Sequence, residues 1–145
     1  MPFFKRRSVP PGTPIPARAT FTAGMATDPD GKPFQVRRNV ALDRVMGHPD
    51  YPHRVGATVL GEGLPPIVLQ RLEDALVAAC ERGRESVLAL VLSAPPRYHE
   101  FVFYSRAPSA ALLRCREVGD AFPEAQLQVY AERDPRWALY RDLVR

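Results

Sequence analysis

Cysteine is scarce in this chain, and its scarcity limits the kinds of protein that the sequence can encode. Only two cysteines occur among 145 residues, Cys80 and Cys115, and they lie far apart in the sequence. A small disulfide scaffold or a cysteine-rich zinc module needs more of them. The sequence is therefore typical of a protein that works in a reducing compartment, and we predict a cytoplasmic location.

Long apolar runs are also missing. The basic cluster Lys5–Arg7 is followed at once by Ser8 and by prolines, whereas a signal peptide needs an apolar run of about seven or more residues at that place. No segment approaches the roughly 20 apolar residues that a membrane-spanning helix requires. We therefore predict neither secretion nor membrane association.

Common enzyme motifs are absent as well. No serine lies in a G-x-S-x-G elbow, and the sequence contains neither a Walker loop nor a dinucleotide-binding fingerprint. Both cysteines fall on apolar helix stripes, where a thiol behaves as a small buried hydrophobe. The sequence thus predicts no catalytic residue, no metal and no cofactor.

Positive charge is concentrated in one short segment. The net charge is +4, and the first twenty residues contain four basic and no acidic side chains, so that sixteen basic and sixteen acidic residues remain elsewhere. A neutral domain does not favour a nucleic-acid partner. We interpret the aromatic residues between 101 and 104 as part of the core. Four arginines near the central loop are interpreted as solvated surface residues, namely Arg37, Arg38, Arg44 and Arg54.

The first eighteen residues differ in composition from the rest. They contain several prolines and no apolar periodicity, which predicts a disordered, basic, proline-rich leader. Residues 19–145 form one predicted domain, a length that suits a single core. Met25 is an alternative start of the protein.

The order of predicted elements indicates the fold class. Two β-prone runs, 21–26 and 34–42, flank a strong turn signal at Asp28–Gly31 and predict a hairpin. After it we expect strand 54–60, a helix from Pro65 to about Arg82, strands 87–92 and 100–106, a helix from Pro108 to Phe122, strand 125–131 and a short helix after Asp134. This order predicts an α+β protein with a ferredoxin-like βαββαβ core, preceded by the hairpin and followed by the short C-terminal helix.

Two predicted strands are apolar on both sides. In a ferredoxin-like unit both helices lie on one face of the sheet, yet 87–92 and 101–104 offer apolar side chains to both faces. The second face therefore needs a cover. The candidates are the hairpin, the final helix with Trp137 and Tyr140, and a second copy of the protein, and we expect the final helix together with a homodimer.

The loop before the first core strand contains several side chains that could bind a metal ion or a ligand. His48, Asp50 and His53 are compatible with one zinc or iron ion, and they are equally residues that cap turns in a proline-rich loop. We interpret them as turn-capping residues, and a metal site is the alternative. The candidate residues for binding a ligand or a partner are His48, Asp50, Tyr51, His53, Arg54, Trp137 and Tyr140.

Four phrases of the sequence carry a resemblance to a known family. They are HPDYPHRVG at 48–56, LEDAL at 72–76, EFVFY at 100–104 and DPRWALY at 134–140. In this order they resemble a bacterial family catalogued as a domain of unknown function, number 695, over roughly residues 21–145. The resemblance implies no activity and no site residues.

The second half of the chain also looks distantly like another family. An aromatic strand, a helix, a strand and the ending Asp-Pro-x-Trp-x-x-Tyr are similar to the B-type regulators of ribonuclease E activity. Those proteins are inhibitory binding proteins. We therefore predict a non-catalytic binding or regulatory domain that acts through contacts with a protein partner, and the alternative is a small-molecule or metal-dependent site on the His48–Arg54 loop.

Overall fold

The computed structural model describes residues 8–94 and 98–143. Its centre is one six-stranded sheet in which every neighbouring pair of strands is antiparallel. The order across the sheet is β1-β2-β4-β5-β3-β6. The strands are β1 (Phe21–Thr27), β2 (Pro33–Asn39), β3 (His53–Val59), β4 (Ser86–Ala94), β5 (Tyr98–Ser105) and β6 (Leu127–Arg133). The structure confirms the predicted α+β class.

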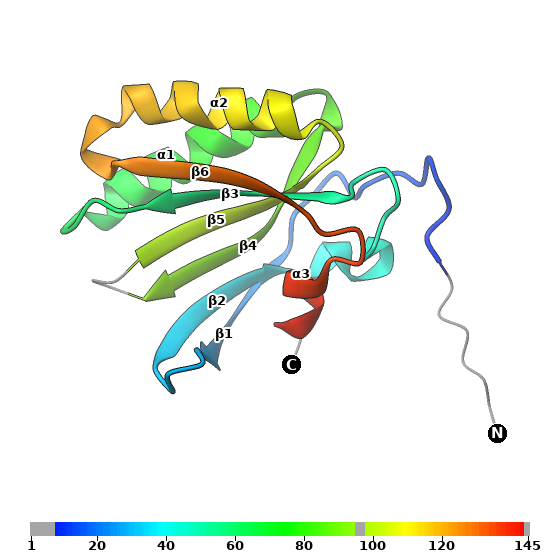
Figure 1. Ribbon diagram of the computed structural model, residues 1–145, viewed down its shortest axis with the longest axis horizontal. Coiled ribbons are helices and arrows are strands. Elements are labelled where there is room, and N and C mark those ends of the chain that lie inside the picture. Colours follow the sequence, from blue (N-terminus) through cyan, green and yellow to red (C-terminus); the bar gives the residue numbers. More distant parts are fainter. Residues whose placement is uncertain (1–7, 95–97, 144–145) are drawn as a thin grey trace.

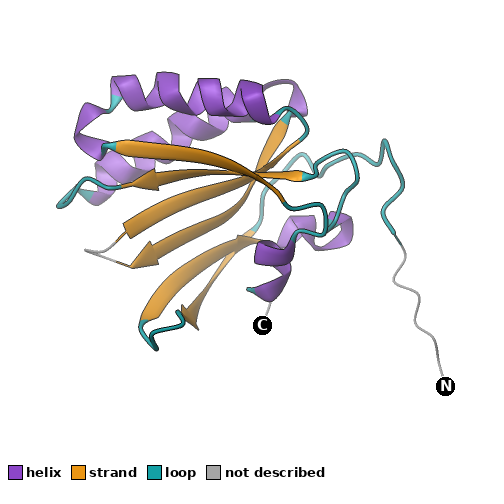
Figure 2. Ribbon diagram, in the orientation of Figure 1, coloured by secondary structure: helices purple, strands orange, loops and turns teal. Residues whose placement is uncertain are grey.

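Two long helices cover one face of this sheet, as Figures 1 and 2 show. Helix α1 spans Pro66–Cys80 and helix α2 spans Pro108–Ala121. Each begins with a proline in its first turn, where no intrahelical N–H is needed. Most of their predicted apolar stripes are buried. The buried members are Leu72, Leu76 and Cys80 on α1 and Ala111 and Cys115 on α2. The other predicted members, Leu69, Val118 and Phe122, are partly buried.

The sheet separates two apolar cores, because side chains of a strand point alternately to its two faces. On the helix side Phe101 and Phe103 of β5 pack beneath α1 and α2. On the opposite side Val102 and Tyr104 of the same strand contribute to a second core. Both faces of β4 and β5 are therefore buried, which their continuous apolar sequences predict.

Short segments of the chain cover the second face. They are the 3-10 helix η1 (Val40–Val45), the short helix α3 (Ala138–Asp142) and Ile15, which is 7% exposed. The hairpin β1–β2 does not lie over the sheet as a cover. It extends the sheet instead, because β2 pairs with β4.

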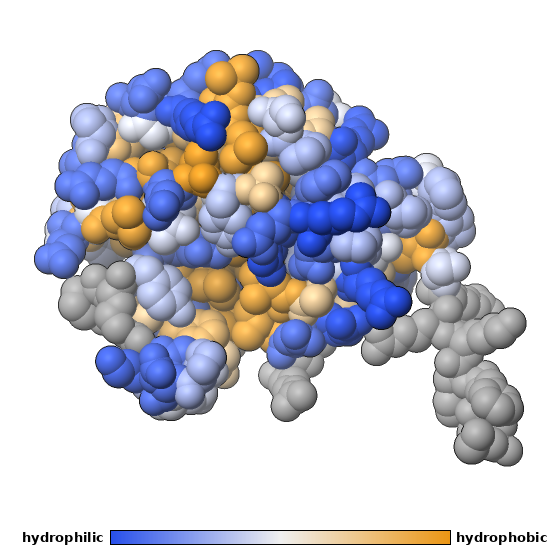
Figure 3. Space-filling view, viewed as in Figure 1, coloured by the Kyte–Doolittle hydropathy of each residue, from blue (hydrophilic) through white to orange (hydrophobic). Residues whose placement is uncertain are grey.

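The cover of this face leaves some apolar surface in view beside the hairpin, although most of β4 and β5 is buried. Figure 3 shows apolar surface in the hollow between the β1–β2 end and the rest of the molecule. The requirement for a cover is thus met partly by the chain itself, and the homodimer stays a prediction.

Two predicted element boundaries are wrong. Residues 40–42 were expected to continue a strand, but η1 begins at Val40, where the Asn39 side chain accepts a hydrogen bond from the Ala41 N–H at 3.3 Å. The final helix was expected to start after Asp134. It starts at Ala138, because Trp137 adopts the left-handed conformation with φ 54° and ends a separate turn.

The leader also differs from the sequence-based expectation where the structure describes it. Residues 8–18 contain no helix or strand, yet Ile15 belongs to the second core. The Thr13 carbonyl oxygen lies 2.7 Å from His48 Nε2, and the Ile15 carbonyl accepts a hydrogen bond from Arg84. Lys5–Arg7 lie outside the described residues. A single buried isoleucine gives no periodic signal, which is why the sequence did not predict this contact.

Within the two described ranges, no helix has the length and apolar character needed to span a membrane.

Candidate functional site

The seven predicted binding residues come from two distant segments that meet at one end of the sheet. His48, Asp50 and Tyr51 lie in the loop before β3, and His53 and Arg54 begin that strand. Because His53 is paired with Arg133 of β6, the chain after β6 continues into the same region. Trp137 and Tyr140 therefore arrive beside the loop.

Trp137 is the centre of this cluster and is 0% exposed. Its indole is stacked on the ring of Tyr104, with centroids 4.2 Å apart and planes inclined by 10°. The indole Nε1–H donates to the Tyr51 carbonyl oxygen at 2.9 Å. A buried indole with a satisfied N–H anchors the loop to the sheet, so Trp137 has a structural role in this arrangement.

Asp134 joins the strand, the turn and the helix. Its Oδ2 accepts a hydrogen bond from the Tyr104 hydroxyl at 2.8 Å, and its Oδ1 accepts one from the Ala138 N–H at 2.7 Å. Arg54 Nη1 lies 3.8 Å from the same carboxylate. Burial, together with the bond to Asp134, raises the pKa of Tyr104, so its hydroxyl remains protonated as a donor.

Tyr140 connects α3 to η1. Its hydroxyl lies 2.6 Å from Asp43 Oδ1 and 2.9 Å from the Asn39 carbonyl oxygen, and it accepts a hydrogen bond from Arg38 Nη1 at 3.2 Å. Burial is the main reason why the pKa of Tyr140 is raised. Its hydroxyl, like that of Tyr104, is fully used within the fold.

His48 is buried and both of its ring nitrogens are engaged. Nε2 donates to the Thr13 carbonyl oxygen at 2.7 Å, and Nδ1 accepts from the Asp50 N–H at 3.0 Å. The Asp50 carboxylate accepts from the Gly12 N–H at 2.7 Å. Since a metal ligand needs a free nitrogen lone pair, His48 is not available to a metal ion in this structure. The turn-capping interpretation describes the loop.

The remaining two predicted residues are partly buried. Arg54 forms an ion pair with Glu132, while its Nε atom is buried without a hydrogen-bond partner in the described part of the chain. The same holds for Nδ1 of His53. Among the residues that the structure describes, no three His, Cys, Asp or Glu side chains are grouped so that they could hold a metal ion.

A cleft of about 630 Å³ lies over this cluster. One wall is formed by η1 and Gly47, and the other is formed by Pro135 and Arg136. The two walls are close at Gly47, because a Cβ at this position would lie 3.9 Å from the Pro135 carbonyl oxygen. The remaining lining residues include Ser8, Val9, Met46 and the charged residues Asp43, Arg44 and Arg141. The buried cluster thus holds the two walls of this cleft in place.

The described residues that line the cleft include three arginines but only one acid, Asp43, which is bonded to Arg38 and Tyr140. Arg44 and Arg136 are exposed, and neither has an ion-pair partner among the described residues. Three of the four arginines near the loop, Arg37, Arg38 and Arg54, form ion pairs with acidic residues. The fourth, Arg44, lines the cleft.

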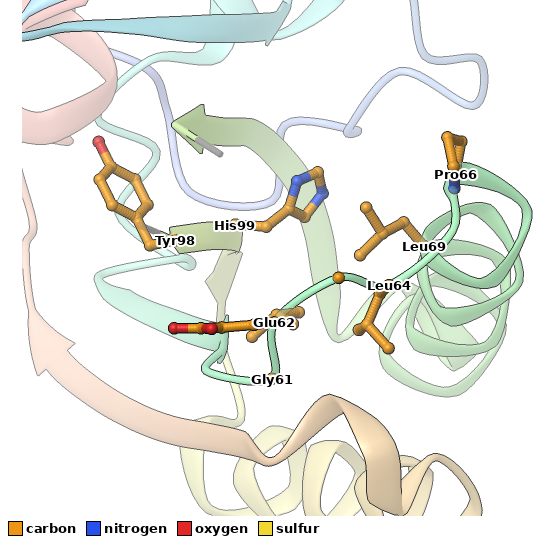
Figure 4. Close-up of a pocket in the computed structure, with 9 residues that line it drawn as sticks. Gly61, Glu62, Leu64, Pro66, Leu69, Tyr98 and His99 are labelled. Carbon is orange, nitrogen blue, oxygen red and sulfur yellow. The ribbon is translucent and has the colours of Figure 1, made fainter. Parts of the chain in front are cut away.

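A second cavity, of about 350 Å³, lies at the opposite end of the sheet. It is formed by the end of β3, the loop that leads to α1, the first turns of α1 and the start of β5 (Figure 4). This cavity was not predicted from the sequence, because its lining residues come from two segments, 59–69 and 98–99, that are far apart in the chain. The one available signal was His99 beside a Gly-Glu-Gly loop, and that pattern is not specific.

The fold and these sites define the protein as an α+β domain with an antiparallel sheet, two covering helices and a cavity at each end. The sequence matches the family model of DUF695, a family of unknown function, over residues 25–144, and the chain therefore belongs to this family. Searches of the curated proteins and of the solved structures found no match.

Proposed function

We propose that this protein is a non-catalytic regulatory domain that binds an acidic segment of a partner protein in the arginine cleft. The observation that carries the proposal is the excess of arginine there, with Arg44 and Arg136 free of acidic partners among the described residues. Two guanidinium groups without acidic partners on the two walls of one cleft can both bind an external anion, and charge-assisted hydrogen bonds of this kind are strong. Arginine also binds carboxylates in a bidentate geometry.

Rigid support beneath the cleft agrees with this proposal. Arg136 precedes Trp137, which is fully buried, and Arg44 lies in η1, which is fixed through the Asp43–Tyr140 bond. A binding group that is held in place loses little conformational entropy when the partner arrives. His48, Tyr51, Trp137 and Tyr140 therefore belong to the proposed site as positioning residues.

The fold and the second-half resemblance support the same class of function. The four strands of the core follow one another as β6-β3-β5-β4, with both long helices on one face, and we assign this arrangement to the ferredoxin-like class. The likeness to the B-type regulators of ribonuclease E activity points toward regulation by protein contacts. Homodimerisation and a cytoplasmic location remain predictions.

Binding of a labelled Glu/Asp-rich octapeptide, followed by fluorescence anisotropy, tests the cleft. We expect Arg136→Glu and Arg44→Glu to weaken binding at least tenfold, because each replaces an attraction by a repulsion. The control is Arg116→Glu, which makes the same change of charge at an exposed position on α2 and is expected to weaken binding less than twofold.

Two results would contradict the proposal. If all three variants lose affinity equally, the peptide responds to net charge and not to the cleft. If a single-stranded oligonucleotide of the same charge binds more tightly than the peptide, the cleft binds nucleic acid instead.

A further inference from the structure

The cavity at the start of α1 has the size and the walls of a small-molecule site. Its volume of about 350 Å³ falls in the range of natural ligand pockets, roughly 300–1,000 Å³. Val59, Leu64, Pro66 and Leu69 line it with apolar groups. Figure 4 shows Leu69 beside the imidazole of His99, while the side chains of Leu64, Glu62 and Tyr98 extend away from this ring.

His99 is the polar group that lies among these apolar walls. Its Nδ1 is 3.2 Å from Ser93 Oγ, and its ring makes an edge contact with Phe101 at 4.9 Å between centroids. Burial lowers the pKa of His99. Among the nearby charges, Glu73 raises this pKa and Arg37 lowers it. The imidazole is therefore neutral at pH 7. A neutral imidazole with Nδ1 directed to Ser93 has one further nitrogen with which to bond a ligand.

The surroundings of the cavity disfavour negatively charged ligands. Glu62 lines the cavity and is exposed at its rim. Arg37, the positive group that acts on His99, is already paired with Glu73 at 2.7 Å. A carboxylate or phosphate would therefore meet repulsion without a compensating cation.

Two exposed apolar residues are direct sequence neighbours of the lining residues. Leu60 and Ile67 are adjacent in sequence to the lining residues Gly61 and Pro66, and they are 50% and 59% exposed. They are two of only four large hydrophobic side chains that are exposed in the described part of the chain. Exposed apolar side chains that adjoin the lining residues in the chain agree with a binding site in this region.

We propose that this cavity binds a neutral, mainly apolar small molecule, such as an aromatic alcohol, whose single hydrogen-bonding group is held by His99. This site is independent of the arginine cleft, because Val59 is paired with His99 at the end of β3 opposite to His53.

Titration of the full-length protein with 2-naphthol, followed by calorimetry and by ¹H–¹⁵N NMR, tests this site. We expect a dissociation constant below about 1 mM, with the largest amide shifts in residues 59–69 and at His99. 2-Naphthoate, which has the same rings but carries a negative charge, should bind at least tenfold more weakly. Failure of 2-naphthol to bind, or equal binding of the two compounds, would overturn the proposal.

Two variants distinguish binding in this cavity from binding at other apolar surface. Leu64→Trp should fill the cavity and reduce binding at least tenfold, whereas Leu113→Trp, at an exposed position on α2 that is 57% exposed, should leave it unchanged. His99→Leu should reduce binding of 2-naphthol about tenfold, the loss expected for one hydrogen bond. Should Leu64→Trp fail to fold, the amide shifts in the unmodified protein decide, and shifts located outside residues 59–69 and His99 contradict the site.

Discussion

Trp137 shows how a strained residue can organise a fold. A residue with a side chain costs roughly 1–3 kcal/mol in the left-handed region, and Trp137 lies there with φ 54°. The conformation turns the chain so that the indole enters the second core, stacks on Tyr104 and donates to Tyr51. Burial of a whole indole and its hydrogen bond together offset that cost.

Truncation of Trp137 should therefore be severe. We expect Trp137→Ala to lower the free energy of unfolding by about 3–5 kcal/mol, the usual loss for a buried aromatic ring, as measured by urea denaturation. Leu113→Ala is the control, because Leu113 is exposed on α2 and should change stability by less than about 0.5 kcal/mol. A loss below about 1 kcal/mol for Trp137→Ala would contradict the structural role assigned to the ring.

The residues that join this cluster could be found from the sequence only in part. Trp137 and Tyr140 were predicted as one apolar side of a helix, and both are fully buried. Tyr104 was predicted as core, which is correct, but its bond to Asp134 spans thirty residues. No local pattern specifies which hydroxyl meets which carboxylate, because the pairing depends on the strand order.

At the scale of elements, α1 and α2 meet through their two cysteines. Cys80 and Cys115 are both 0% exposed, and their Sγ atoms are 3.5 Å apart. The hydrogen bond from Cys115 lowers the pKa of Cys80, and the same bond raises that of Cys115. Reaction with a reagent nevertheless requires access, and neither thiol has any.

We expect both thiols to react slowly with a disulfide reagent such as dithionitrobenzoate in the native protein and rapidly in guanidinium. Leu113→Cys provides the control, since it places a third thiol on an exposed position of the same helix and should react within seconds. Rapid reaction of Cys80 or Cys115 in the native protein would show that the two helices separate easily.

The elements themselves were largely predictable. The types of these elements were predicted correctly from three patterns. These are the proline in the first turns of α1 and α2, the apolar stripes at helical spacing, and the alternation of apolar and polar residues in β6. The 3-10 helix η1 was not predictable, because residues 40–42 continue an apolar pattern and only the Asn39 cap ends the strand. The arginine cleft and the His99 cavity depend on contacts between distant segments, so neither could be located from spacing.

At the scale of the whole molecule, the leader contributes to stability. Composition alone predicts that removal of residues 1–18 leaves the melting temperature unchanged. The structure predicts a loss, because the deletion removes the buried Ile15 side chain and the carbonyl acceptors of His48 and Arg84.

Ile15→Ala isolates the apolar part of this contribution. We expect it to lower the free energy of unfolding by about 2 kcal/mol, a decrease in melting temperature of roughly 4–8 °C for a domain of this size. Arg18→Ala, at an exposed position of the same segment, should change it by less than about 0.5 kcal/mol. If both variants have the same melting temperature as the unmodified protein, the leader does not pack on the domain.

The strand order determines when this sheet can be completed during synthesis. His53 of β3 pairs on one side with Ser105 and on the other with Arg133, so the strand has no neighbour until β5 is made and only one until β6 is made. Tyr104 and its apolar neighbours on the second face obtain the cover of Trp137 later still. A nascent chain on the ribosome therefore exposes this apolar sheet face until residues 137–140 have been added. During that interval the chain is most exposed to aggregation and most dependent on chaperones.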